Sequence, residues 1–215
     1  RPRWRSRSPR RGEVRGALVG HDVVDEDRRR AVLAGQREHR LGQAEPDPVG
    51  FGEHLGNPLR LRRPLDAGVR VVVAHCASLG HGEELNGAAQ GGKPGNFELF
   101  VRLMDEPQYR KTLYGDISAV VQSNRVDVLD TLLTRRDWQG RLLNGSDYPL
   151  PGVVPLIDLN KLVSRGLLNE SIAEPLRALR HSNVLLFDFV LKRNLSFKGQ
   201  RFANEVFETA PFFAR

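Results

Sequence analysis

A histidine and an aspartate each follow an apolar segment of the sequence, at the point where a strand would end. His75 follows the run Val71–Ala74, and Asp147 lies shortly after Leu142–Leu143. In α/β barrels and in open α/β sheets, ligands bind at the carboxyl ends of the parallel strands. An imidazole and a carboxylate at two such ends can share a divalent metal ion or act as an acid/base pair. The spacing therefore predicts a site that contains His75 and Asp147.

Each of these residues also has a purely structural interpretation. His75 could hydrogen-bond a nearby loop, and Asp147 lies in a Ser-Asp-Tyr-Pro sequence of the kind found in turns. Asp116, which lies in another apolar segment, is expected to bond neighbouring backbone. Cys76 is expected to be a small buried residue, because the sequence pairs no base with it. Spacing alone leaves both interpretations of His75 and Asp147 open.

The elements that must position these residues alternate between strand and helix after residue 57. Apolar, β-branched runs predict strands at 69–74, 113–117 and 141–145. Such alternation is typical of parallel βαβ units, so we expect an α/β fold. Helices are predicted at 57–68, 96–107, 126–133, 156–165 and 169–193, with Asn57 and Asn96 as N-caps and a break in the last helix near His181–Asn183.

The first 56 residues have a different composition from the rest of the chain. They are rich in Arg but contain no Lys, Ile, Asn, Thr, Tyr, Met or Cys. Their apolar residues follow neither a strand period nor a helix period, so we expect no stable core from them. We therefore divide the chain into an N-terminal segment, residues 1–56, and an α/β part, residues 57–215.

The composition of residues 1–56 has three interpretations. The missing amino acids include those with AT-rich codons, which favours a GC-rich sequence translated in a non-native frame. A disordered, solvated tail is the second interpretation. The third is an RNA-binding arm at residues 1–11, because Arg-rich segments can fold on RNA. Of these, we favour the frame-shifted origin and expect no nucleic-acid partner.

The overall composition excludes several classes of protein. The chain has 215 residues, 33 Lys and Arg against 26 Asp and Glu, and one cysteine. A single Cys76 provides neither a disulfide framework nor a Cys-based zinc site. The sequence contains no run of 18 apolar residues and no secretory signal, so we expect a cytoplasmic protein without a membrane partner. The net charge of +7 first suggests nucleic-acid binding, but part of it lies in the unusual N-terminal segment.

Four motifs after residue 56 resemble the amidohydrolase-related family of metal-dependent TIM barrels. Residues 56–78, which end in Val-Val-Val-Ala-His-Cys-Ala-Ser, are similar to the family's sixth-strand region. The other motifs lie at 96–105, at Tyr-Gly-Asp-Ile-Ser (114–118) and at Asn-Gly-Ser-Asp-Tyr-Pro (144–149). Their order and spacing agree with the family as well. The resemblance extends from residue 56 to about residue 210.

The resemblance implies an incomplete (β/α)8 TIM barrel, comprising about the last three βα units. Asp147 matches the family's eighth-strand aspartate, which binds metal and takes a proton from the metal-bound water. His75 matches the sixth-strand histidine, which is a metal ligand in some members and an acid/base group in others. The implied cofactor is a divalent ion, zinc first and manganese second, and the implied partner is a small-molecule substrate. A homo-oligomer is left open.

The sequence also departs from the family pattern. It contains no His-x-His motif, which the family carries on its first strand, and neither His39 nor His54 follows a strand-like run. We therefore expect a metal-dependent hydrolase of the amidohydrolase type that is truncated, binds metal weakly and has little or no activity. The alternatives are an Arg-rich nucleic-acid-binding tail on a non-catalytic α/β module, and a related barrel that decarboxylates or hydrates.

Overall fold

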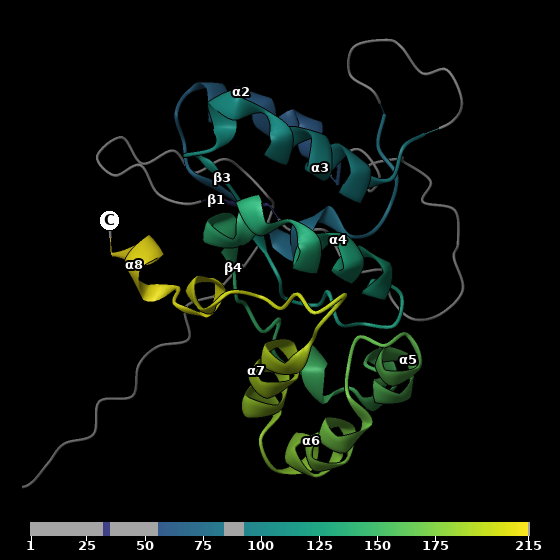
Figure 1. Cartoon of the computed structure of the whole chain (residues 1–215). Coiled ribbons are helices and arrows are strands. Elements are labelled where there is room, and N and C mark those ends of the chain that lie inside the picture. The colour runs from purple at the N-terminus through teal and green to yellow at the C-terminus, as the bar shows by residue number, and fades with distance from the viewer. Residues whose placement is uncertain (1–31, 35–55, 84–92, 215) are drawn as a thin grey trace, which may run out of the picture.

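A parallel sheet forms the centre of the protein in the computed structural model, which describes residues 32–34, 56–83 and 93–214 (Figure 1). The strands pair in the order in which they occur in the chain, and each pair is parallel. The prediction of an α/β fold is therefore confirmed. The strands are β1 (Val32–Ala34), β2 (Val71–Val73), β3 (Leu113–Asp116) and β4 (Leu142–Leu143).

Helices follow each of the strands β2 to β4. In Figure 1, α2 and α3 lie together at one end of the molecule, while α5, α6 and α7 group at the other. The α-helices are α2 (Arg62–Asp66), α3 (Asn96–Asp105), α4 (Leu129–Thr134), α5 (Leu159–Ser164), α6 (Glu170–Ser182), α7 (Val184–Asn194) and α8 (Ala210–Phe213). Short 3-10 helices occur at η1 (Pro58–Leu61), η2 (Ala74–Ala77), η3 (Pro107–Tyr109), η4 (Val126–Val128), η5 (Arg136–Arg141), η6 (Leu150–Gly152), η7 (Val154–Leu156) and η8 (Asn204–Phe207).

The two faces of the sheet are covered differently. Because side chains alternate along a strand, Val71 and Val73 of β2 point to one face and Val72 to the other. Val71 and Val73 join the main apolar core, which contains the buried side chains of α3 and α4. Val72 belongs to a small separate cluster with Leu143 and Phe212, the last contributed by α8. Among the described helices, those between the strands therefore pack on one face of the sheet.

Most of the predicted element boundaries agree with the structure. Asn57 is the N-cap of η1 and accepts a hydrogen bond from the Leu59 N–H at 2.9 Å. Gly68 follows α2 with a φ of +77°, a conformation in which glycine carries no steric penalty. The long C-terminal helical region divides at Asn183, which caps α7 by accepting from the Leu186 N–H.

The predicted cap at Asn96 is wrong. Gly95 occupies the N-cap position of α3, and Asn96 is its first helical residue. The Asn96 side chain donates instead to the Leu79 carbonyl, 3.0 Å away. The Asn96 side-chain oxygen, the atom that would cap a helix, has no hydrogen-bond partner among the described residues, because Asn96 is itself the first helical residue and its side chain turns to Leu79.

The division of the chain at residue 56 stays a prediction. Apart from Val32–Ala34, which pair with β2, and Gly56, the N-terminal segment lies outside the described residues, as do His39, His54 and the Arg-rich residues 1–11. None of the helices in the described ranges is both long enough and apolar enough to cross a membrane.

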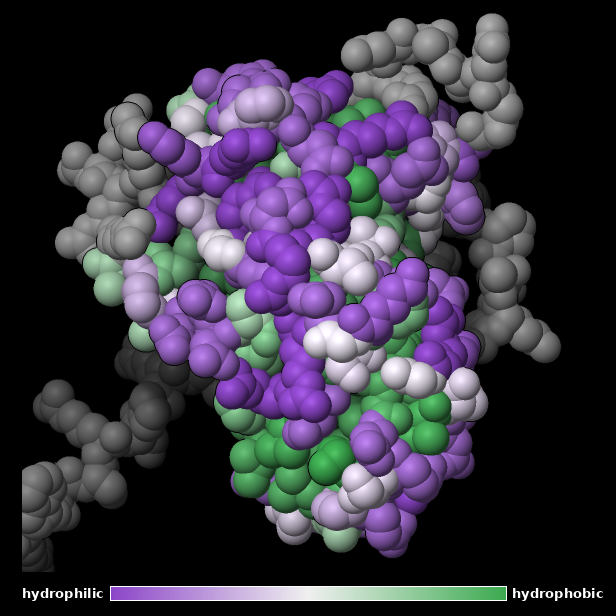
Figure 2. All heavy atoms as spheres, viewed as in Figure 1, coloured by the Kyte–Doolittle hydropathy of each residue, from purple (hydrophilic) through white to green (hydrophobic). Residues whose placement is uncertain are grey.

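Figure 2 shows apolar surface gathered over the α6–α7 end of the molecule. The exposed large apolar side chains include Val153, Val154, Leu185, Leu186 and Phe189.

Candidate functional site

The two residues predicted to form a site lie next to each other. His75 follows β2 and Asp147 follows β4, and the distance from His75 Nε2 to Asp147 Oδ2 is 3.8 Å. The side chain of His75 is 9% exposed and that of Asp147 is 25% exposed. Asp147 Oδ2 is itself buried and has no hydrogen-bond partner among the described residues. Burial without a partner is costly for a carboxylate oxygen, so this atom is available to a proton or a cation.

The second nitrogen of His75 is held by a chain of hydrogen bonds from β3. His75 Nδ1 lies 2.7 Å from Ser118 Oγ. The Ser118 hydroxyl donates to Asp116 Oδ2, and the Ser118 N–H donates to Asp116 Oδ1 at 2.8 Å. Asp116 therefore bonds neighbouring backbone as predicted, but it also reaches His75 through Ser118.

The backbone is strained where the strands end. His75, Cys76 and Ala77 have φ values of 54°, 50° and 51°, and Asp147 has a φ of 55°. The left-handed conformation costs a residue with a side chain on the order of 1–3 kcal/mol, and such residues cluster at functional sites. Ala119, next to Ser118, has a φ of 53°. Positive φ values thus occur just after β2, β3 and β4, although apolar packing alone does not require them.

A buried ion pair on α7 supports the segment that carries Asp147. Lys192 Nζ donates to the Gly145 carbonyl and to Asp188 Oδ2, both at 2.7 Å. The side chains of Lys192 and Asp188 are 0% and 2% exposed. Burial raises the pKa of Asp188, Lys192 opposes that rise, and the nearby Asp116 and Asp147 add to it. Three carboxylates and one ammonium group are therefore close enough to influence one another.

Sequence reasoning missed Lys192 and Asp188 as parts of this arrangement. Asp188 lies within the otherwise apolar run Val184–Leu191 of α7, and Lys192 follows directly after that run, four residues from Asp188. Two opposite charges at that spacing share one helix face. Their place on the buried face of an amphipathic helix was the available signal.

Cys76 has the structural role that the sequence suggested. Its side chain is fully buried, and Sγ donates to the Asp116 carbonyl at 3.3 Å. Burial, with a smaller effect of the Asp116 charge, raises the pKa of the Cys76 thiol. The thiolate that would act as a nucleophile or ligand is thus disfavoured.

We expect Cys76 in the folded protein not to react with a thiol reagent such as DTNB at pH 8. The reagent needs an accessible thiolate, and both burial and the raised pKa oppose one. The measurement is thiol release with and without guanidinium chloride, where one thiol should react only after unfolding. A Ser182→Cys variant, which adds a thiol at an exposed position, serves as the reactive control. Rapid labelling of the native wild-type protein would contradict the expectation.

The site fits part of a metal centre. Zinc lies about 2.0–2.2 Å from nitrogen and oxygen ligands, and its tetrahedral geometry places two ligand atoms about 3.4 Å apart. The observed 3.8 Å separation of His75 Nε2 and Asp147 Oδ2 is slightly wider than that, so a small movement of either side chain would let one ion contact both. No group of three or more metal-ligating side chains occurs within the described ranges. His75 and Asp147 therefore fit as two ligands of a divalent ion.

Comparison with known proteins adds no assignment. No protein-family model matches the chain, and no curated protein or solved structure matches it either. The similarity of the four motifs to the amidohydrolase-related family stays a prediction from the sequence.

Proposed function

We propose that this chain is the C-terminal part of a metal-dependent hydrolase of the amidohydrolase type. The observation that carries the proposal is the convergence of His75 Nε2 and the unpartnered Asp147 Oδ2 at the carboxyl ends of β2 and β4. In α/β barrels the carboxyl ends of the strands form the active site. The substrate would be a small molecule with a hydrolysable amide, ester or similar bond.

The arrangement of the sheet supports an incomplete barrel. Its strands follow one another in chain order and are all parallel. The helices between them pack with Val71, Val73 and Leu113 on one face. A doubly wound sheet would instead reverse its strand order and carry helices on both faces. Sequential order with helices outside is what consecutive units of a (β/α)8 barrel contain.

Each side chain has a defined part in the proposed reaction. A divalent ion, zinc or manganese, would lower the pKa of a bound water towards ~7 and polarise the scissile carbonyl. His75 presents Nε2 as one ligand and Asp147 presents Oδ2 as another. Asp147, which is partly exposed, accepts a proton from the attacking water and returns it to the leaving group. Related decarboxylation or hydration would use the same two side chains.

Metal binding tests the proposal directly. We expect weak binding of Zn²⁺ or Co²⁺, because two ligands are fewer than the three that catalytic zinc sites typically use. Asp147→Asn and His75→Gln should each weaken metal binding by more than about 10-fold. Substituting residues that only hydrogen-bond a metal ligand already lowers metal affinity by about that much. Isothermal titration calorimetry and the visible spectrum of Co²⁺ provide the measurements.

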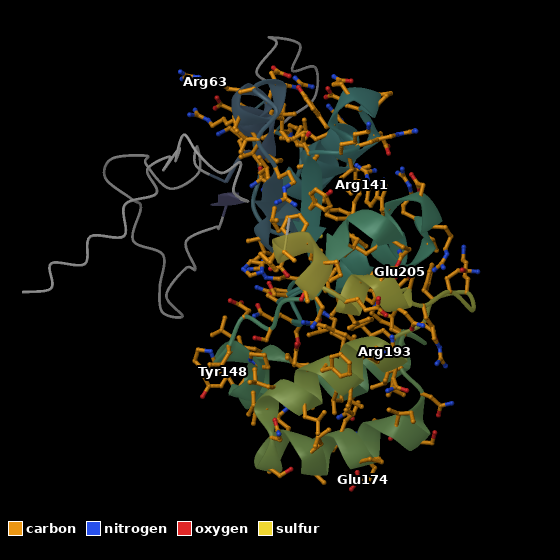
Figure 3. The ribbon with its side chains drawn as sticks, turned by 90° about the vertical axis from the view of Figure 1, so that its left-hand side faces the viewer. Arg63, Arg141, Tyr148, Glu174, Arg193 and Glu205 are labelled. Carbon is orange, nitrogen blue, oxygen red and sulfur yellow. The ribbon has the colours of Figure 1, made fainter. Side chains whose placement is uncertain are left out.

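A carboxylate far from the site provides the control. Glu174 lies on α6 at the far end of the molecule from the sheet, whereas Tyr148, which follows Asp147 in the chain, lies nearer the sheet (Figure 3). Glu174→Gln should bind Co²⁺ as the wild-type protein does. Binding that is absent from the wild-type protein, or equal in the wild type, Asp147→Asn and His75→Gln, would refute the proposed function.

A further inference from the structure

The hydrogen bonds around Ser118 have only one consistent direction when Asp116 is ionised. A carboxylate has no hydrogen to donate, so Asp116 accepts both from the Ser118 N–H and from the Ser118 hydroxyl. The hydroxyl has a single hydrogen, which Asp116 takes. Towards His75 Nδ1, 2.7 Å away, Ser118 Oγ can therefore act only as an acceptor. His75 Nδ1 must carry the hydrogen of that bond.

We propose that Asp116 and Ser118 hold neutral His75 in the tautomer protonated at Nδ1. In this tautomer Nε2 carries the lone pair, and Nε2 is the atom that faces Asp147 Oδ2. Ser118 and Asp116 are thus positioning residues that act through His75. The purpose of this tautomer, ligation of an ion by Nε2, rests on the proposed function, whereas the tautomer itself is a property of the chain without metal.

Burial favours one direction for the hydrogen bonds between Asp116, Ser118 and His75. Ser118 and His75 are both buried, so water has little access to replace either hydrogen bond. The Asp116 carboxylate also lies against the backbone of Gly145, where a Cβ would come within 2.6 Å of Asp116 Oδ1. The carboxylate is therefore confined between the ends of β3 and β4. A confined acceptor fixes the direction of the Ser118 hydroxyl.

Nitrogen NMR measures the tautomer without any metal or substrate. The protein is labelled with ¹⁵N at histidine and studied at pH 9, where protonated and unprotonated ring nitrogens have widely separated shifts. In the wild-type protein, His75 should show a protonated Nδ1 and an unprotonated Nε2. Ser118→Ala should shift His75 towards the Nε2–H form that free histidine prefers. Ser118→Thr, which keeps the hydroxyl, should preserve the wild-type pattern.

Asp116→Asn should invert the tautomer. The Ser118 N–H can only donate, so the new amide must turn its oxygen towards it. Its NH2 group then faces Ser118 Oγ and donates to it. The Ser118 hydroxyl hydrogen is released to His75 Nδ1, and the ring proton moves to Nε2. No general loss of stability would produce this exchange of the two nitrogen signals, and the dispersion of the amide spectrum verifies that each variant is folded.

The outcomes separate this inference from the proposed function. A wild-type His75 protonated at Nε2, or at both nitrogens at pH 9, would overturn the inference, as would an unchanged tautomer in Asp116→Asn. If the tautomers behave as expected but Co²⁺ does not bind, only the proposed function fails. Where both hold, Ser118→Ala should bind Co²⁺ about 10- to 100-fold more weakly, and Ser118→Thr should not.

Discussion

Replacing Lys192 with methionine should lower the free energy of unfolding by about 3–5 kcal/mol at pH 7. The substitution keeps the length and most of the volume of the side chain but leaves the buried Asp188 carboxylate without its counter-ion. It also removes the hydrogen bond to the Gly145 carbonyl. An uncompensated buried charge is among the most destabilising changes that a single substitution makes. Urea denaturation followed by circular dichroism measures the effect.

The pH dependence of this variant should have a definite sign. Burial raises the pKa of Asp188, and the loss of Lys192 removes the one group whose charge and hydrogen bond oppose that rise. Below its unfolded pKa of ~3.9, Asp188 is neutral in both states and carries no ionisation penalty. As the pH increases through the raised folded pKa, the penalty develops. The difference in stability between Lys192→Met and wild type should therefore be smaller at pH 4 than at pH 7.

Two matched variants control for loss of packing and loss of charge. In the double variant Lys192→Met/Asp188→Leu the buried charge is gone, so most of the lost stability should return. Lys111→Met removes an exposed lysine and should change stability by no more than about 0.5 kcal/mol. If Lys192→Met were as stable as Lys111→Met, the ion pair would not be buried in the folded protein.

Replacing Trp138 with alanine should cost about 3–5 kcal/mol. The ring is fully buried and packs edge-on against Phe100, with centroids 6.0 Å apart, while the Arg135 guanidinium lies 4.0 Å from it. Alanine would leave a large cavity between η5 and α3. Protein interiors are close-packed, so the surrounding side chains should fill only part of this cavity.

Trp138→Phe is the informative partner of this variant. Trp138 Nε1 has no hydrogen-bond partner among the described residues, so phenylalanine removes no hydrogen bond. It also retains a ring against Phe100. Its destabilisation in urea should therefore be clearly smaller than that of Trp138→Ala. Equal losses for the two variants would mean that the indole N–H makes an essential bond.

The sequence predicted β2, β3, β4 and most helix ends because their signals are local, whereas β1 was not predicted. The run Val71–Val73 is β-branched and apolar, and Asn57 and Asn183 are caps that act within three residues. Asn96 shows the limit of such signals. Its side chain bonds Leu79, which lies 17 residues away in the sequence, and a local rule cannot rank that partner above the helix N-terminus.

The residues of the candidate site likewise fall into two groups, those that the sequence predicted and those that it did not. Position at a strand end identified His75 and Asp147, because parallel strands bring their carboxyl ends together. The importance of Ser118 and Lys192 arises instead from contacts across 43 and 47 residues, with His75 and with Gly145 respectively. Those contacts depend on the register of β2 with β3 and on where α7 packs beside the segment that follows β4. Neither is specified by the residues themselves.

The chain order of the strands has a consequence for synthesis on the ribosome. Each strand can pair with the strand made just before it, so the sheet can grow as the chain emerges. The segment between β4 and Asp147 acquires its hydrogen-bond partners later in synthesis. The N–H of Asn144 donates to the carbonyl of Val206, and the carbonyl of Gly145 accepts from the Lys192 ammonium group. The placement of Asp147 beside His75 is therefore supported only by late-synthesised residues, long after both side chains have been made.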